Sequence, residues 1–256
     1  MKKLILLSFL ISTGCVEISK KEEAKPNFGL VIHGGAGTIL RENMTPEKEE
    51  KYRAVLAEAI QEGHKILKMG GSSQEAVERT INIMEDSPLF NAGKGAVLNS
   101  NASIELDASF MEGKSLGAGA ISGVRTVKNP ISAAIKVMEA SPHVMLSGSG
   151  ADAFASEQGL EIVSPDYFLT ERRINALKEV QKASSISKTN HKYQSTDFIN
   201  QQRYGTVGCV ALDMFGNLAA GTSTGGMTNK KWNRIGDAPI IGAGTYANNA
   251  TCAISS

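Results

Sequence analysis

The first third of the chain has a pattern of apolar and polar positions that predicts a strand followed by a long helix. Residues 28–33 (FGLVIH) form an apolar run that ends at the glycines of residues 34–37, which is typical of a buried strand. From Pro46 onward, apolar residues recur at helical spacing until Gly70–Gly71, and Thr45 can cap the first turn. We therefore expect a strand at the start of the domain and a long helix after it.

Further helices and strands follow in blocks. Ser72–Glu75 (SSQE) is a capping box for a second helix that extends through Met84. Residues 103–111 and 116–124 are typical of two adjacent short strands, and a proline opens a third helix over residues 130–140. This order of elements does not match a regular βαβ alternation.

The C-terminal third changes from charged to apolar and glycine-rich. A charged helix is expected from about Thr170 to Lys182, and the polar, aperiodic stretch that follows predicts a mobile linker over about residues 183–205. Residues 206–213 (TVGCVALD) and 217–224 (NLAAGTST) then predict a β-hairpin. The whole pattern indicates a mixed α+β fold.

Residues 1–15 have the pattern of an export signal. Two lysines precede the short apolar run of residues 4–11, and small residues follow. Cys15 directly after these small residues resembles the lipobox of bacterial lipoproteins, so we expect a lipid anchor there, with simple signal cleavage as the alternative. Residues 16–27 would then be a polar tether, and the protein would be exported, either periplasmic or anchored to a membrane.

The composition suits one globular domain over residues 28–256. Hydrophobic residues make up 41% of the 256 positions, enough for a sizeable core. The 27 basic and 26 acidic residues leave a net charge of +1, so no nucleic-acid partner is expected. Cys209 and Cys252 both lie in apolar contexts, which predicts buried free thiols rather than a disulfide.

The Gly205–Thr206 pair lies where the polar linker becomes an apolar strand. A threonine hydroxyl needs a neighbouring base to act as a nucleophile, and the α-amine of an N-terminal threonine, with a pKa of about 7.7–8.0, can be that base. Cleavage of the Gly205–Thr206 bond would create such a terminus. The alternative is a turn followed by a β-branched residue that opens a strand.

A second stretch supplies groups that suit an amino-acid ligand. Thr222, Ser223 and Thr224 precede two glycines, and Arg234 and Asp237 follow. A guanidinium suits a carboxylate and a carboxylate suits an ammonium, so the last pair predicts a pocket for an α-amino acid. The alternative is that Arg234 and Asp237 form a surface ion pair with each other.

Residues 221–225 (GTSTG) also match the nucleophile elbow of α/β-hydrolases, with Ser223 as nucleophile. That motif must lead into a helix, and residues 226–234 do not have a helical pattern. The catalytic histidine of that fold follows the serine, whereas all four histidines precede it: His33, His64, His143 and His191. We interpret His33 as part of a tight turn that packs near the nucleophile.

From Phe28 to the last residue, the sequence resembles the plant-type L-asparaginase/isoaspartyl peptidase family of N-terminal nucleophile hydrolases. The resemblance is carried by several unusual motifs in one order: HGGAGTI, PLFNAGKGAVLN, ELDASFM, GTVGCVALD, GNLAAGTSTGG and NRIGDAPIIGAGTYANN. It implies a four-layer αββα sandwich, divided by self-cleavage into an α-subunit over residues 28–205 and a β-subunit that starts at Thr206. It also implies a dimer of such αβ pairs.

The resemblance implies a role for each candidate residue. Thr206 would be both the cleavage site, with Gly205, and the nucleophile, and Thr224 would polarise it. Arg234 and Asp237 would hold the α-carboxylate and α-amine of the substrate. The implied reaction is hydrolysis of β-aspartyl (isoaspartyl) peptides and of L-asparagine to L-aspartate.

The segment MEDSPLFNAGK, residues 84–94, is similar to the sodium-binding loop of this family. No cofactor is expected for catalysis, but a structural Na⁺ is implied. Carbonyl oxygens suit such a hard cation. Its implied main-chain ligands are Met84, Glu85, Ser87, Phe90, Ala92 and Lys94.

The family pattern continues beyond the CAISS-like strand, residues 252–256, with a Thr-Gly-rich loop that supplies oxyanion donors. The resemblance therefore implies a sandwich that lacks its C-terminal part, and activity is expected of a longer parent rather than of these 256 residues. Two other functions stay open. One is a glycosylasparaginase-type hydrolase, against which Gly205 and Gly225 argue. The other is a truncated, inactive lipoprotein that only binds amino acids.

Overall fold

The structure is a computed structural model that describes residues 28–35, 44–190 and 205–256. The predicted signal, its Cys15 anchor and the tether lie outside these residues, as do residues 191–204 of the predicted linker. None of the described helices is both long enough and apolar enough to cross a membrane.

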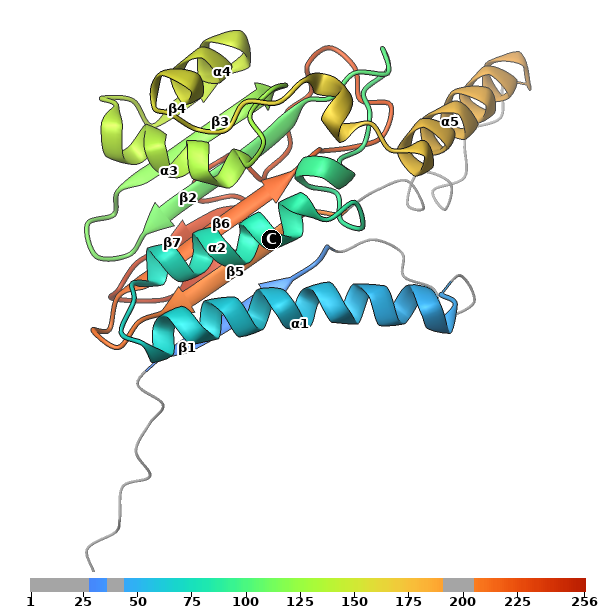
Figure 1. The fold of residues 1–256 in the computed structure, drawn as a ribbon. Helices are drawn as coiled ribbons and strands as arrows, with labels where there is room; N and C mark the ends of the chain where they lie inside the picture. Colours follow the sequence, from blue (N-terminus) through green and yellow to red (C-terminus); the bar gives the residue numbers. More distant parts are fainter. Residues whose placement is uncertain (1–27, 36–43, 191–204) are drawn as a thin grey trace, which may run out of the picture.

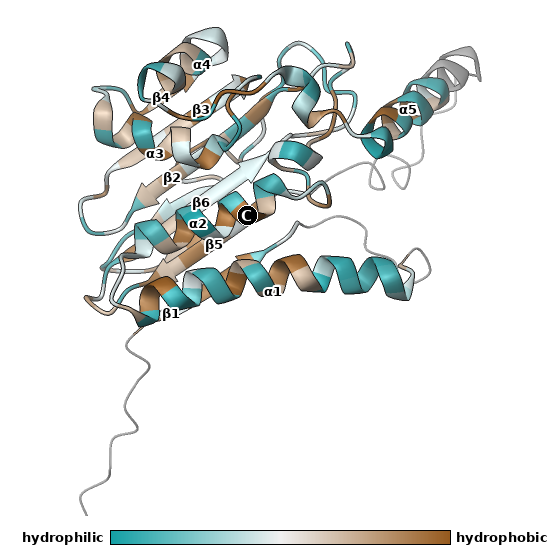
Figure 2. Cartoon of the chain, in the orientation of Figure 1, coloured by the Kyte–Doolittle hydropathy of each residue, from teal (hydrophilic) through white to brown (hydrophobic). Residues whose placement is uncertain are grey.

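The predicted helices of the first half are confirmed, because their start signals act locally. Helix α1 (Pro46–Lys68) begins after Thr45, whose side chain accepts a hydrogen bond from Lys48 N at 3.3 Å. Helix α2 (Ser73–Asp86) begins after Ser72, which accepts from Glu75 N at 3.1 Å. Helix α3 (Pro130–Ala140) has its proline in the first turn, as predicted. Figure 2 shows that the N-terminal half of α1 is mostly hydrophilic, whereas β2 and β5 are mostly apolar.

Six strands form one sheet in the order β1-β5-β6-β2-β3-β4 (Figure 1). Neighbours are antiparallel except for the parallel pair β3–β4. The predicted hairpin is β5–β6, and the predicted adjacent strands are β2–β3. The bounds are β1 (Gly29–His33), β2 (Leu106–Glu112), β3 (Ala118–Val124), β4 (Met145–Ser147), β5 (Val207–Leu212) and β6 (Leu218–Thr224).

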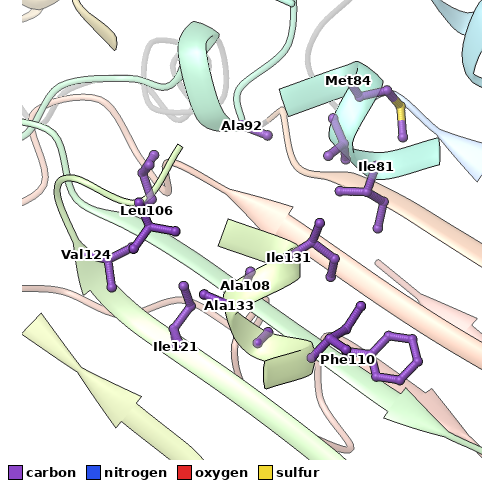
Figure 3. Close-up of a cluster of buried hydrophobic side chains, with 14 of the residues drawn as sticks. Ile81, Met84, Ala92, Leu106, Ala108, Phe110, Ile121, Val124, Ile131 and Ala133 are labelled. Carbon is purple, nitrogen blue, oxygen red and sulfur yellow. The ribbon is translucent and has the colours of Figure 1, made fainter. Parts of the chain in front are cut away.

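The core lies between this sheet and the helices on one of its faces. Figure 3 shows side chains of α2 and α3 directed at those of β2 and β3, among them Ile81, Ile131, Phe110 and Ile121, and all four are fully buried. Every residue of β2 except the last is buried, which requires cover on the other face as well.

A second sheet of two antiparallel strands covers that other face. It consists of β7 (Thr245–Ala247) and β8 (Ala253–Ser255). Ser109 of β2 points toward it and donates hydrogen bonds to Ala238 O at 2.6 Å and to Thr245 Oγ1 at 2.7 Å. The layers confirm an α+β sandwich. Within residues 28–35, 44–190 and 205–256, one helical layer and two sheets are present, and a second helical layer is not among the described elements.

The predicted linker begins too early, because helix α5 (Glu171–Asn190) continues past Lys182. Residues 183–190 contain neither glycine nor proline, so nothing in the backbone ends the helix there. Ser184 Oγ donates to Val180 O at 2.8 Å, which gives its hydroxyl a partner one turn back. The pattern also did not predict five short elements: η2 (Gly93–Gly95), β4, α4 (Gly148–Glu157), η3 (Pro165–Phe168) and β7.

The two described cysteines differ in their surroundings. Cys209 on β5 is a buried free thiol, as predicted. Cys252 is also free but exposed, so the prediction of burial is wrong there. It lies directly before β8, and β8 pairs only with β7. An apolar sequence context alone does not place a residue under another layer.

Candidate active site

Two threonine hydroxyls meet at the ends of the central strands. Thr206 directly precedes β5 and Thr224 ends β6, and the pairing of Val207 with Ser223 brings them side by side. Thr206 Oγ1 donates a hydrogen bond to Thr224 Oγ1 at 3.2 Å. Thr224 Oγ1 also accepts from Gly226 N at 3.0 Å. The bond from Gly226 N orients the Thr224 hydroxyl so that its oxygen accepts the hydrogen bond from Thr206.

The Gly205–Thr206 peptide is packed between Gly35 and Asn91, which leaves no room for a side chain on either glycine. Gly35 has φ +118°, and a Cβ on it would lie 2.6 Å from Gly205 Cα. On the other side, a Cβ on Gly205 would lie 2.8 Å from Asn91 Cβ. A residue other than glycine at position 35 would therefore be both strained and in collision with this peptide.

Asn91 is a central polar residue of the site, although its sequence context is equally that of a turn residue. The residue is 3% exposed. Its Nδ2 donates to Gly226 O at 2.7 Å, and its Oδ1 accepts from Val97 N at 2.9 Å. Its main-chain oxygen accepts from Gly225 N at 3.0 Å. Asn91 thus fixes the turn whose amide supports Thr224.

All four residues singled out for catalysis and binding line one cavity of about 320 Å³. Thr206 and Thr224 face it from the sheet, and Arg234 and Asp237 face it from the loop that follows β6. Among the described residues no ion pair joins Arg234 to Asp237, so the surface-pair alternative is not what the structure contains. A guanidinium and a carboxylate on one cavity wall can hold the two charged α-groups of an amino acid.

Ser223 does not lie in this cavity, which removes the α/β-hydrolase interpretation. It is fully buried on the opposite face of β6, and its Oγ donates to Glu85 Oε1 at 2.7 Å. No helix follows it in the described residues 224–256. Glu85 is fully buried too, and this burial raises its pKa to about 8, against the effect of the hydrogen bonds it accepts from Ser223 and from Ile131 N.

His33 at the end of β1 packs beside the nucleophile. Its Nε2 lies 3.1 Å from Ser255 Oγ. Burial lowers the pKa of His33, and a hydrogen bond with the Thr206 backbone opposes the shift. The imidazole is therefore neutral at neutral pH. Among the described residues its hydrogen bonds are with the backbone of Thr206 and with Ser255 Oγ.

The loop after α2 has the carbonyl chemistry that a hard cation requires. The carbonyls of Pro88, Leu89 and Gly95 accept hydrogen bonds from Arg172, Tyr52 or Arg173, and that of Ala92 accepts from Gly95 N. For Ser87, Phe90 and Lys94, no hydrogen bond to the carbonyl is recorded within the described part of the chain. Carbonyl oxygens are the type of ligand that a hard cation prefers. The described residues include no group of three or more His, Cys, Asp or Glu side chains able to hold a metal.

Comparisons with known proteins agree with the motifs. The isoaspartyl peptidase of Salmonella typhimurium is 47% identical over 226 residues, which cover 88% of this chain and 71% of that protein. The isoaspartyl peptidase of Escherichia coli is also 47% identical, with 88% and 70% covered. The isoaspartyl peptidase/L-asparaginase of Mus musculus is 46% identical, with 88% and 65% covered. A family model described as asparaginase matches residues 26–256, and the chain therefore belongs to this asparaginase family, as its motifs predicted.

Proposed function

We propose that this protein hydrolyses β-aspartyl (isoaspartyl) peptides and L-asparagine to L-aspartate, with Thr206 as an N-terminal nucleophile released by self-cleavage. The observation that carries the proposal is the 3.2 Å hydrogen bond from Thr206 to Thr224 in a cavity that Arg234 and Asp237 also line. The names of relatives that are 46–47% identical support the same reaction.

Self-cleavage begins with attack of Thr206 Oγ1 on the carbonyl carbon of Gly205. The C–N bond breaks as the ester forms, and the nitrogen of Thr206 takes the proton that the hydroxyl loses. Water then hydrolyses the ester and leaves a carboxylate on Gly205 and a free α-amine on Thr206. The close packing of Gly35 and Asn91 around this peptide supports the proposal, because it holds the carbonyl in one position.

Substrate hydrolysis uses the same hydroxyl. Arg234 and Asp237 hold the α-carboxylate and α-amine, which directs the side-chain carbonyl of the aspartyl unit toward Thr206. The α-amine of Thr206 accepts the hydroxyl proton, a β-aspartyl ester forms, and the departing ammonia or peptide amine takes that proton. Water attacks the ester with help from the same amine and releases L-aspartate.

The test combines mass spectrometry with product detection. Purified protein should give two fragments, one of which begins Thr-Val-Gly-Cys, and should release L-aspartate from β-aspartyl-leucine. Thr206→Ala should abolish both, whereas Thr251→Ala, at an exposed threonine outside the cavity, should change neither. Because the relatives are longer, the assay is repeated with the C-terminal segment of the Salmonella relative placed after Ser256. Hydrolysis that survives Thr206→Ala, or a chain that stays intact in both forms, would contradict the proposal.

We also propose a structural Na⁺ at main-chain oxygens of the last turn of α2 and of the loop that follows it, with the six ligands implied by the resemblance. It is supported by the carbonyls of Ser87, Phe90 and Lys94, for which no hydrogen bond is recorded among the described residues. Replacement of Na⁺ in the buffer by a large organic cation should lower the unfolding temperature of the protein. No change on removal would contradict the site.

Export and assembly are further proposals. The pattern of residues 1–15 supports a signal with a lipid on Cys15, which Cys15→Ser should abolish in mass spectra of the mature protein. The family resemblance supports a dimer of αβ pairs, which sedimentation would measure. A mature chain that keeps Met1, or a single αβ pair in solution, would contradict the respective proposal.

A further inference from the structure

A fully buried lysine lies on the same side of the sheet as the reacting threonines. Lys230 is 2% exposed, and its Nζ donates to Glu105 O at 3.0 Å. Two carboxylates surround the ammonium: Glu105 Oε2 at 3.7 Å and Asp107 Oδ2 at 3.8 Å. Lysines are almost never fully buried unless their charge is paired, so the groups around Lys230 must account for its burial.

Asp107 connects the lysine to the active site. In the pairing of β2 with β6 it lies directly opposite Thr224. Its Oδ1 accepts from Ser122 Oγ at 2.8 Å and from Gly123 N at 2.9 Å. Its Oδ2 is buried with no hydrogen-bond partner, so the Lys230 ammonium is its charge partner. The carboxylate is thereby held in one orientation next to the strand that carries Thr224.

The lysine side chain also lies against the turn that supports Thr224. A Cβ on Gly226 would lie 3.1 Å from Lys230 Nζ and 3.3 Å from its Cδ. Gly226 is the residue whose amide donates to Thr224 and whose carbonyl accepts from Asn91. Movement of Lys230 would therefore free the backbone that orients the Thr224 hydroxyl.

The same residue holds the loop that leads to Arg234. Its backbone is bonded on both sides, to Met227 O at 3.1 Å and from Ser100 N at 2.9 Å. Three non-glycine residues around it have positive φ: Asn229 at 62°, Trp232 at 55° and Asn233 at 52°. Such conformations are disfavoured for residues other than glycine and persist where the surroundings impose them. Lys230 is the buried anchor in this strained segment, four residues before Arg234.

We propose that Lys230 is a positioning residue of the proposed hydrolysis: its buried ammonium, held by Asp107 and Glu105, keeps the Gly226 turn under Thr224 and keeps Arg234 at the cavity. The inference rests on the proposed function. Stability alone does not account for the lysine, because buried ion pairs are often replaced by apolar side chains without loss of stability. The ion pair instead holds the Gly226 turn under Thr224 and the loop that carries Arg234 in one geometry.

The test removes the pair without leaving an unpaired buried charge. Lys230→Met combined with Asp107→Asn neutralises both partners, and Glu105 keeps its ion pair with Arg125 at 3.0 Å. The matched control is Lys128→Met with Glu161→Gln. It removes a lysine–carboxylate pair whose charged atoms lie 2.8 Å apart and whose glutamate side chain is 63% exposed.

We expect the pair variant to fold, to cleave itself more slowly, and to show kcat lowered about 100-fold with a raised Kd for L-aspartate, because small misplacements of reacting groups have effects of that size. The control should keep kcat within about twofold. The single variant Asp107→Asn keeps the bond from Lys230 to Glu105 O and should show an intermediate kcat.

Each outcome bears on one of the two proposals. If the unmutated protein neither cleaves itself nor hydrolyses substrate, also with the added C-terminal segment, the proposed function fails. If it is active and the pair variant has an unchanged kcat and an unchanged Kd for L-aspartate, the positioning role is refuted. If the pair variant does not fold, Asp107→Asn decides: kcat equal to that of the control refutes the role, and a kcat at least tenfold lower supports it.

Discussion

Replacement of Asn91 by aspartate should make the stability of the protein depend on pH in a way that the structure determines. Asn91 donates to Gly226 O at 2.7 Å and accepts from Val97 N at 2.9 Å, and the residue is 3% exposed. In Asn91→Asp the acceptor remains, but an ionised carboxylate oxygen faces the Gly226 carbonyl where an amide N–H was.

The size of the effect follows from the two protonation states. A buried, unpaired carboxylate destabilises a fold by about 3–5 kcal/mol. A protonated carboxyl can donate to Gly226 O, which reduces the loss to about 1 kcal/mol. The difference of about 3 kcal/mol raises the pKa of the new carboxyl by about two units, from its usual value of about 3.9 to about 6.

The sign of the pH dependence follows from this raised pKa. Between about pH 4 and pH 6 the folded variant holds a proton that the unfolded chain has released, so its free energy of unfolding falls as the pH rises. Above about pH 6 the difference from the unmutated protein should be constant at its largest value. The rate of self-cleavage, divided by that of the unmutated protein, should also be lower at pH 8 than at pH 5. At pH 8 the ionised carboxylate no longer donates a hydrogen bond to Gly226 O, so the Gly225–Gly226 turn is held less firmly.

The assay is urea unfolding from about pH 4 to pH 8 in a Thr206→Ala background, so that the chain stays uncut. Asn101→Asp, at an exposed position, is the matched control and should follow the parent at every pH. A stability difference for Asn91→Asp that does not vary with pH would refute the reasoning. It would mean that Asn91 does not donate to the Gly226 carbonyl.

Three other predictions test the surroundings of the site. Gly35→Ala should stop self-cleavage, because its Cβ would lie 2.6 Å from Gly205 Cα at φ +118°, and N-terminal sequencing would detect any Thr206 terminus that still forms. In sodium-free buffer the free energy of unfolding should fall as pH rises from about 5 to 8, because folded Glu85 keeps its proton up to about 8; Glu85→Gln should remove that component of the slope, and equal slopes would count against it. Native alkylation followed by peptide mapping should modify the exposed Cys252 and spare Cys209, whose thiol pKa is raised by burial; equal labelling would be inconsistent with the fold.

Capping and turn signals in the sequence correctly predicted the helices and the hairpin that contain them. Thr45 and Ser72 cap helices that start where the sequence indicates, and the hairpin strands around residues 213–217 pair as their pattern predicts. Prediction was weaker at ends without a signal: nothing in residues 183–190 indicates whether the helix continues, and it does.

Four site residues could also be identified from sequence, because each stands in an unusual motif. Thr206, Thr224, Arg234 and Asp237 carry chemistry that suits an N-terminal nucleophile and an amino-acid ligand, and the structure places all four on one cavity. Their roles in the reaction remain predictions that the experiments above address.

The sequence by itself determined the family, the elements with local start signals, and the residue types that can attack a carbonyl and hold an amino acid. Only the tertiary structure decided what supports them. Asn91 bonds to Gly226, 135 positions away, and Lys230 bonds to Glu105, 125 positions away. From the sequence, Asn91 is typical of a turn and Lys230 of a solvent-exposed side chain. The local pattern does not indicate which distant strand will cover either side chain. Burial and partner are properties of the packed layers, so they become visible only when β2, β5 and β6 lie side by side.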